Sequence, residues 1–84
     1  MTMLTKGRPI KVIHQLKYSP EFARWHAYDG NTYCYSLHCG DGLCLRVSNH
    51  YFPAHMELDT HWYVLIEDDK FRLHPNQIYD AFLF

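Results

Sequence analysis

The sequence predicts a small α+β domain, with an antiparallel sheet that carries two short helices on one face. Two stretches, 32–48 and 61–74, alternate apolar and polar residues with a period of two, the pattern of half-buried strands. Two others, 20–28 and 75–84, open on a proline and place apolar residues at helical spacing. Because 84 residues suffice for one modest core, we expect a single domain over 1–84.

The chain begins with a segment, 1–9, that ends in Gly-Arg-Pro and is expected to be flexible. A first strand is expected over 10–16. Its alternation slips at Val12 and Ile13, which indicates a bulge or burial on both faces. This strand joins the sheet built by the two hairpins.

A helix is predicted over 20–28. Ser19 can cap its free N–H groups, Pro20 suits the first helical position, and Gly30 can end it in a left-handed cap. Three aromatic residues recur at three-residue spacing and form one stripe, which we assign to the core and not to a ligand site: Phe22, Trp25 and Tyr28.

Residues 32–48 are predicted to form a β-hairpin. A two-residue turn would put its apolar sets on opposite faces, whereas a three-residue turn at 40–42 puts them on one face. We assign Tyr33 to this core face and not to a base-stacking surface. The register gives three facing pairs: Cys39 with Leu43, Leu37 with Leu45, and Tyr35 with Val47.

The same register sets His38 opposite Cys44, where an imidazole base would activate a thiolate. This pair is a candidate catalytic site, although neither an oxyanion hole nor an orienting third group is identified. A zinc site is not expected, because Cys34 and His38 alone lie roughly 13 Å apart along the strand and the cysteines lack Cys-x-x-Cys spacing. We therefore expect free thiols and no cofactor.

Residues 49–60 are the least regular segment, and Pro53 argues against a central strand there. A connection this long either has a function or hides an element. Its bulky side chains and the apolar C-terminus are candidate protein-binding residues: Tyr51, Phe52, His55, Met56 and Phe84. A candidate metal set has spacings that match no helical ligand pattern: His50, His55 and His61.

The second hairpin, 61–74, is expected to turn at Asp68-Asp69. The C-terminal helix then follows, and we expect its apolar end to dock in the core or in a dimer contact. The helices should cover the face that receives these side chains: Tyr33, Tyr35, Leu37, Leu45, Val47, Trp62, Val64, Ile66, Phe71 and Leu73.

Composition narrows the class of function. A net charge of −1 lacks the basic excess of a nucleic-acid binder, so we do not expect nucleic acid as a partner. The sequence shows neither a signal peptide nor a run of apolar residues as long as a membrane span, and its three cysteines suggest a reducing compartment, so we expect a cytoplasmic protein. An aromatic content of 17% exceeds what a small core needs, which favours an interface.

These observations together predict a small intracellular interaction or accessory module, rich in histidine and aromatic residues, with no catalysis of its own. Its partner would be another protein or a second copy of the chain. The alternative is a metal- or thiol-dependent activity that uses the loop histidines or the His38 and Cys44 pair.

Overall fold

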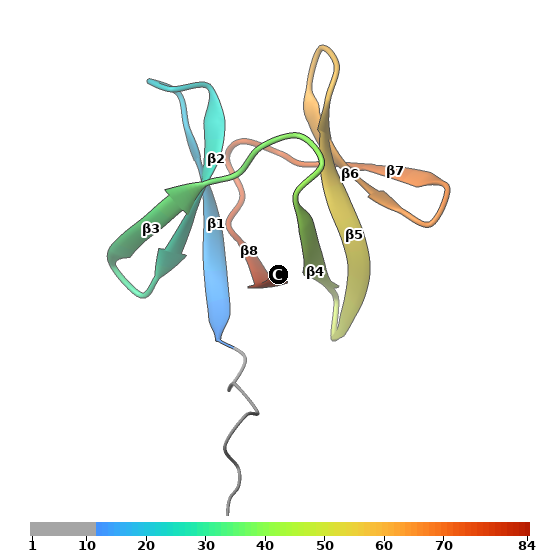
Figure 1. Ribbon diagram of the computed structural model, residues 1–84, viewed down its shortest axis with the longest axis horizontal. Helices are drawn as coiled ribbons and strands as arrows, with labels where there is room; N and C mark the ends of the chain where they lie inside the picture. The colour runs from blue at the N-terminus through green and yellow to red at the C-terminus, as the bar shows by residue number, and fades with distance from the viewer. Residues whose placement is uncertain (1–11) are drawn as a thin grey trace, which may run out of the picture.

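The structure, a computed structural model that describes residues 12–84, contains eight β-strands and no helix over that range. All strands belong to one antiparallel sheet, in the order β3-β2-β1-β8-β4-β5-β6-β7 (Figure 1). The predicted α+β class is therefore wrong, and the described chain is all-β. The strands are β1 (Ile13–Ser19), β2 (Arg24–Asp29), β3 (Thr32–Ser36), β4 (Gly42–Val47), β5 (His50–Leu58), β6 (Trp62–Ile66), β7 (Asp69–Arg72) and β8 (Tyr79–Leu83).

The last strand, β8, holds the two halves of the sheet together. It pairs with β1 on one side and with β4 on the other. In Figure 1 the first three strands lie on one side of β8 and strands β4 to β7 on the other. The C-terminal segment is thus a central part of the fold.

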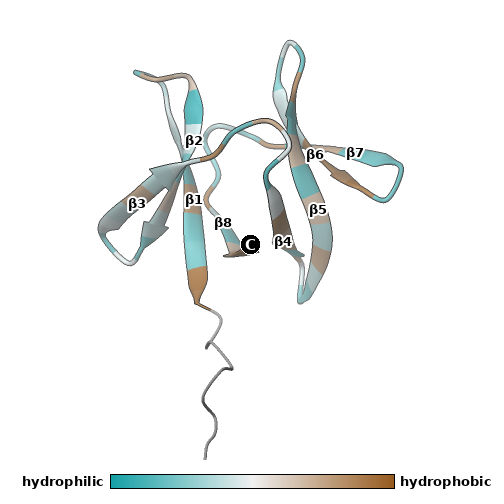
Figure 2. Ribbon diagram, in the orientation of Figure 1, coloured by the Kyte–Doolittle hydropathy of each residue, from teal (hydrophilic) through white to brown (hydrophobic). Residues whose placement is uncertain are grey.

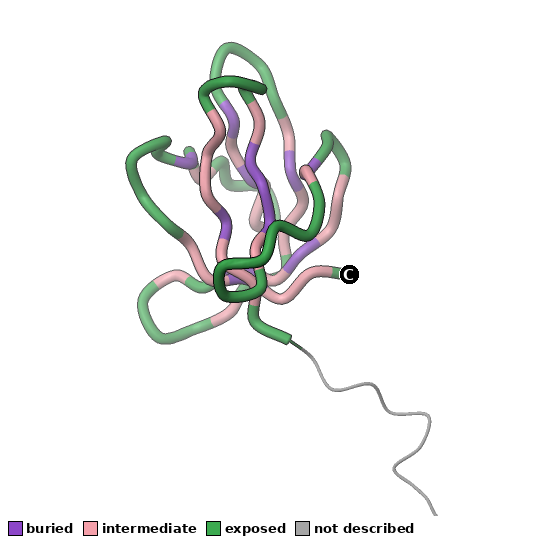
Figure 3. The backbone as a smooth tube through the Cα atoms, turned by 90° about the vertical axis from the view of Figure 1, so that its left-hand side faces the viewer, coloured by how far each residue is buried: buried purple, intermediate pink, exposed green. Residues whose placement is uncertain are grey.

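The core forms on one face of this bent sheet. Hydrophobic and hydrophilic residues alternate along its ribbons (Figure 2), and the buried positions lie along the strands while the turns are exposed (Figure 3). The indole N–H of Trp62 on β6 donates to the carbonyl of Ala23, just before β2, at 3.0 Å, so the two halves meet across the core. The buried hydrophobic residues are Leu16, Trp25, Ala27, Leu37, Leu43, Leu45, Met56, Trp62, Val64, Leu73 and Ala81.

The predicted helix over 20–28 is a turn followed by β2. Ser19 Oγ does accept a hydrogen bond from the Phe22 N–H, at 3.4 Å, but this bond closes a turn and caps no helix. Trp25 is buried in the core as predicted, whereas Tyr28 lies on the opposite face of β2. The aromatic spacing of three misled the prediction because this segment forms a strand, in which successive side chains point to opposite faces.

The predicted C-terminal helix is a turn and then β8. The turn includes a hydrogen bond from the Gln77 N–H to the His74 carbonyl at 2.9 Å. Ala81 is fully buried and Ile78, three residues earlier, is 61% exposed, so the apolar residues at helical spacing in this segment do not form one buried face. Phe84 is 76% exposed and is not buried in the core.

The predicted hairpin over 32–48 has the correct strands but the wrong partners. β3 pairs with β2, and β4 pairs with β5 and β8. The chain crosses between them through residues 37–41, where the Gly40 N–H donates to the Met56 carbonyl on β5 at 2.7 Å. Alternation fixes which side chains face the core, but it does not specify the neighbouring strand.

The segment predicted as an irregular connection, 49–60, contains β5, the longest strand. Pro53 is tolerated because the first half of β5 pairs with β4 alone. The pairing of β5 with its second neighbour, β6, begins only at His55. The proline therefore removes no hydrogen bond from a second ladder.

The hairpin over 61–74 is present as β6 and β7, shifted by two residues from the predicted register. Ile66 pairs with Asp69 and Val64 with Phe71, so the turn is at Glu67-Asp68. A shift of two keeps every side chain on its predicted face.

Of the predicted core, only the two tyrosines, Tyr33 and Tyr35, are exposed. The predicted flexible start, 1–9, lies outside the described residues.

Glu67 gives a stability test of this turn. It holds a φ of 57° at the first turn position, a conformation that costs most residues roughly 1 kcal/mol and glycine nothing. Glu67→Gly should raise the free energy of unfolding by up to about 1 kcal/mol in urea titrations. Asp68→Gly is the matched control and should give no gain, because Asp68 has no positive φ. Equal gains for both variants would contradict the turn assignment.

Candidate functional site

A groove lies on the outer face of β2 and β3, and the connection 37–41 closes one of its ends. Its volume is about 910 Å³. It lies at one edge of the sheet, because β3 is the terminal strand. Its lining residues are Phe22, Arg24, His26, Tyr28, Tyr33, Tyr35, Ser36, His38 and Asp41.

A row of rings forms the floor of the groove. The His26 ring lies between Phe22, at 5.6 Å between centroids, and Tyr33, at 5.0 Å. Tyr33 also meets Tyr28 edge to face at 6.0 Å, and Lys17 Nζ lies 4.7 Å from the centre of the Tyr28 ring. Phe22 and Tyr33 remain 62% and 50% exposed, so aromatic surface is open to a partner.

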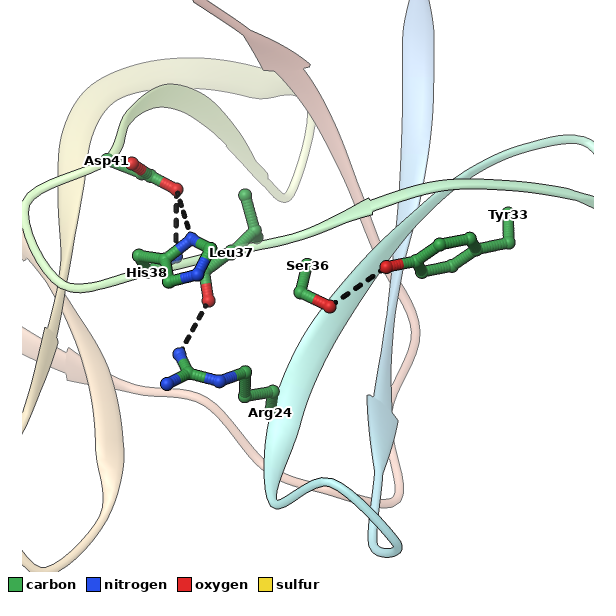
Figure 4. Close-up of polar contacts among 6 residues, drawn as sticks. All are labelled: Arg24, Tyr33, Ser36, Leu37, His38 and Asp41. Atoms are coloured by element: carbon green, nitrogen blue, oxygen red, sulfur yellow. Dashed lines mark hydrogen bonds and ion pairs between the residues drawn. The ribbon is translucent and has the colours of Figure 1, made fainter.

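The other end of the groove is polar (Figure 4). Arg24 donates through its guanidinium to the Leu37 carbonyl at 3.2 Å. Asp41 Oδ2 accepts a hydrogen bond from the backbone N–H of His38 at 2.8 Å and lies 3.9 Å from His38 Nδ1. The polar end of the groove therefore carries one cation and one carboxylate.

A β-bulge shapes the groove wall. The register of β3 against β2 shifts between Ala27 and Tyr28, which leaves Cys34 as the extra residue. Tyr33 and Ser36, three positions apart, consequently reach the same face, where the Tyr33 hydroxyl lies 3.0 Å from Ser36 Oγ (Figure 4). The bulge thus directs Tyr33 into the groove.

The two edges of the sheet differ in charge. β7, at one edge, consists of Asp69, Lys70, Phe71 and Arg72, and charges of this kind protect an edge from further pairing. β3, at the other edge, has no charged residue and exposes both of its tyrosines. No described strand pairs with its outer side. The β3 edge is therefore available for pairing beside the groove.

The predicted catalytic pair does not meet across strands. Cys44 pairs with Pro53 and Phe82, while His38 is exposed in the crossing connection beside Asp41. The correction follows from the partner of β4, which is β5 and not β3. Thiol reactivity at Cys44 stays a prediction.

The predicted protein-binding residues lie along β5 and at the C-terminus, and none of them lines the groove. Met56 is fully buried, so it cannot contact a partner directly. Tyr51 is half-buried and packs on the Phe82 ring at 4.6 Å. Phe52 and Phe84 remain exposed.

The predicted metal ligands are spread along β5 and the turn after it. His50 and His55 are an odd number of residues apart on one strand and so face opposite sides, while His61 lies beyond the end of β5. His55 is instead 3.3 Å from Glu57. Within residues 12–84, no three histidine, cysteine or acidic side chains are grouped closely enough to hold a metal ion.

The polar groove residues Arg24 and His26 were not predicted as site residues, because 20–28 was assigned to a helix. The alternation that could have revealed them was visible: residues 24, 26 and 28 are polar or amphipathic, while Trp25 and Ala27 are apolar.

The described residues include no helix that is long and hydrophobic enough to cross a membrane.

Tyr35 reports on the electrostatics of the groove. Burial raises the pKa of its phenol, and Asp41 and Cys34 raise it further. Because this pKa is higher in the folded state, the stabilising contribution of the phenol is present below its unfolded pKa and disappears as pH rises through the folded value. Asp41→Asn should lower the Tyr35 pKa in an NMR titration of the tyrosine rings. Asp68→Asn, at a distant hairpin tip, should leave it unchanged; an unchanged Tyr35 pKa in Asp41→Asn would contradict the placement of Asp41.

Comparisons with known proteins identify the family of the chain but indicate no activity. Searches of curated proteins and of solved structures gave no match. One family model, described as a domain of unknown function (DUF5348), matches residues 14–82. The match covers most of the chain and begins and ends within the first and last strands in sequence, β1 and β8. The chain therefore belongs to the DUF5348 family.

Proposed function

We propose that this protein is a non-catalytic interaction module that binds an extended segment of another protein along the outer edge of β3. The observation that supports the proposal is the uncharged outer edge of β3, which pairs with no described strand and lies next to the aromatic groove. Adding a strand to a sheet edge is a recurrent mode of peptide recognition, in which the backbone supplies affinity and neighbouring pockets supply specificity.

The backbone of β3 offers hydrogen-bonding groups to such a segment. The Leu37 N–H donates to the Trp25 carbonyl at 2.8 Å, so Leu37 is directed toward β2. Because hydrogen-bonding direction alternates along an antiparallel strand, the preceding residue, Ser36, directs its N–H and C=O outward. Ser36 is therefore the position at which a bound segment would pair.

The groove would receive the side chains of that segment. Exposed rings such as Phe22 and Tyr33 offer apolar and aromatic contact area, which is enriched in protein interfaces. Arg24 and Asp41 give the lining one charge of each sign. A segment with apolar or aromatic side chains at alternate positions fits this lining best.

Another protein is a better occupant than a second copy of the chain. The bulge at Cys34 lies at the centre of β3. Two copies paired antiparallel about a two-fold axis would meet at this interruption on both strands. A partner segment needs only the regular stretch after the bulge.

We also place this module in the cytoplasm. The support is that all three cysteines are free thiols, and that Cys34 and Cys39 are exposed. Exposed free thiols persist in reducing compartments.

The experiment selects linear peptides from a display library against the full chain and then scans one binder by backbone N-methylation. Strand addition predicts that methylation at every second position abolishes binding, because alternate amides donate to the protein. Uniform tolerance to methylation would contradict the proposal. A chain that dimerises through β3 in sedimentation would assign the edge to a second copy.

Ser36 provides a matched pair of variants for the same binder. Ser36→Pro removes the outward N–H and should weaken binding about tenfold, whereas Ser36→Ala keeps that N–H and should bind within about threefold of the original protein. Fluorescence polarisation measures both. Equal affinities for the two variants would show that the peptide does not bind by pairing with the β3 edge.

Tyr33 tests the groove independently of the edge. Tyr33→Ala should reduce affinity at least about tenfold if its exposed ring is a central contact. Tyr63→Ala removes a half-buried tyrosine of β6, outside the groove, and should leave affinity unchanged. The same loss in both variants would point to general destabilisation and against a specific contact.

A further inference from the structure

A second, smaller cavity lies where the two halves of the sheet meet. Its volume is about 210 Å³, and it is distinct from the groove. Aromatic and aliphatic side chains, including Tyr18, Trp25, Trp62 and Leu73, form much of its wall, while Thr60 and Arg72 supply polar groups. The cavity therefore combines apolar walls with hydrogen-bond donors.

One wall residue has an unsatisfied donor. Trp25 is fully buried. Among the buried side-chain nitrogen and oxygen atoms of the described residues, its indole Nε1 is the one that has no hydrogen-bond partner. The other tryptophan of the cavity, Trp62, donates its indole N–H to the Ala23 carbonyl. An indole N–H can only donate, so Trp25 requires an acceptor.

A second wall residue carries a charge without a counter-ion. The Arg72 guanidinium lies 3.3 Å from His61 Nδ1, and no carboxylate of the described residues pairs with it. The neighbouring carboxylate of Asp59 is already paired with Lys70 at 3.3 Å. A guanidinium of this kind recognises carboxylates with two parallel hydrogen bonds.

We propose that this cavity binds a carboxylate group attached to a small apolar body. The carboxylate would take hydrogen bonds from Arg72, and the apolar body would contact the aromatic wall that Trp25 and Trp62 help to form. A free carboxylic acid and the C-terminal residue of a peptide both present this chemistry. The inference stands apart from strand addition at β3, which uses other residues.

Indole NMR signals of the full chain provide the test, because the protein has two tryptophans and one such signal for each. The probe is 3-phenylpropionate, and its neutral matched control is 3-phenylpropionamide. Titration with the acid should shift the Trp25 indole signal, and the amide should bind at least about tenfold more weakly. An unmoved Trp25 signal, or equal binding of acid and amide, overturns the proposal.

Variants and peptides complete the test. Arg72→Gln should weaken binding of the acid at least about tenfold, whereas Lys17→Gln removes the same charge outside the cavity and should bind within about twofold. Equal affinities for the two variants overturn the role of Arg72. A tripeptide with a free C-terminal phenylalanine that binds more tightly than the small acid identifies a chain terminus as the source, and weaker binding identifies a free acid.

Discussion

Over residues 12–84 the sheet has no helix to cover its apolar face, so it buries that face against itself. Three contacts hold it in this bent form. β8 joins the two halves, the Trp62 indole reaches the Ala23 carbonyl, and the crossing connection bonds to both β2 and β5. The small cavity lies where the two halves of the sheet meet, and the groove lies on the outer face of β2 and β3. Both concave features are therefore consequences of how one sheet covers its own core.

The same arrangement leaves the two edges of the sheet far apart in strand order and different in character. Charged side chains occupy β7, whereas β3 presents only uncharged residues beside aromatic rings. An uncharged edge is an aggregation risk that proteins normally remove. The bulge at Cys34 limits that risk by interrupting the edge, and it also directs Tyr33 toward the groove. We interpret the remaining open edge as a binding surface.

The sequence predicted strands well wherever alternation was regular, and it predicted strand partners poorly. Alternation located β3, β4, β6 and β7, and an even shift left the faces of the last two correct. The helices were wrong because local signals, such as the Ser19 cap, occur equally in turns. The groove could not be predicted as a site, since it depends on the pairing of β3 with β2. Its individual residues, Tyr33 and Tyr35, were seen but assigned to the core.

The pairing of β3 is the central claim, because both the open edge and the groove follow from it. Inter-strand contacts between backbone protons, amide to amide in hydrogen-bonded pairs and α to α in the other pairs, are measured by NMR on the free protein and test it directly. The structure predicts that Tyr35 contacts Ala27 and that Ala81 contacts both His14 and Leu45. A contact between Tyr35 and Val47 would instead establish a simple hairpin over 32–48. That result would cover the β3 edge with β4 and contradict the binding site.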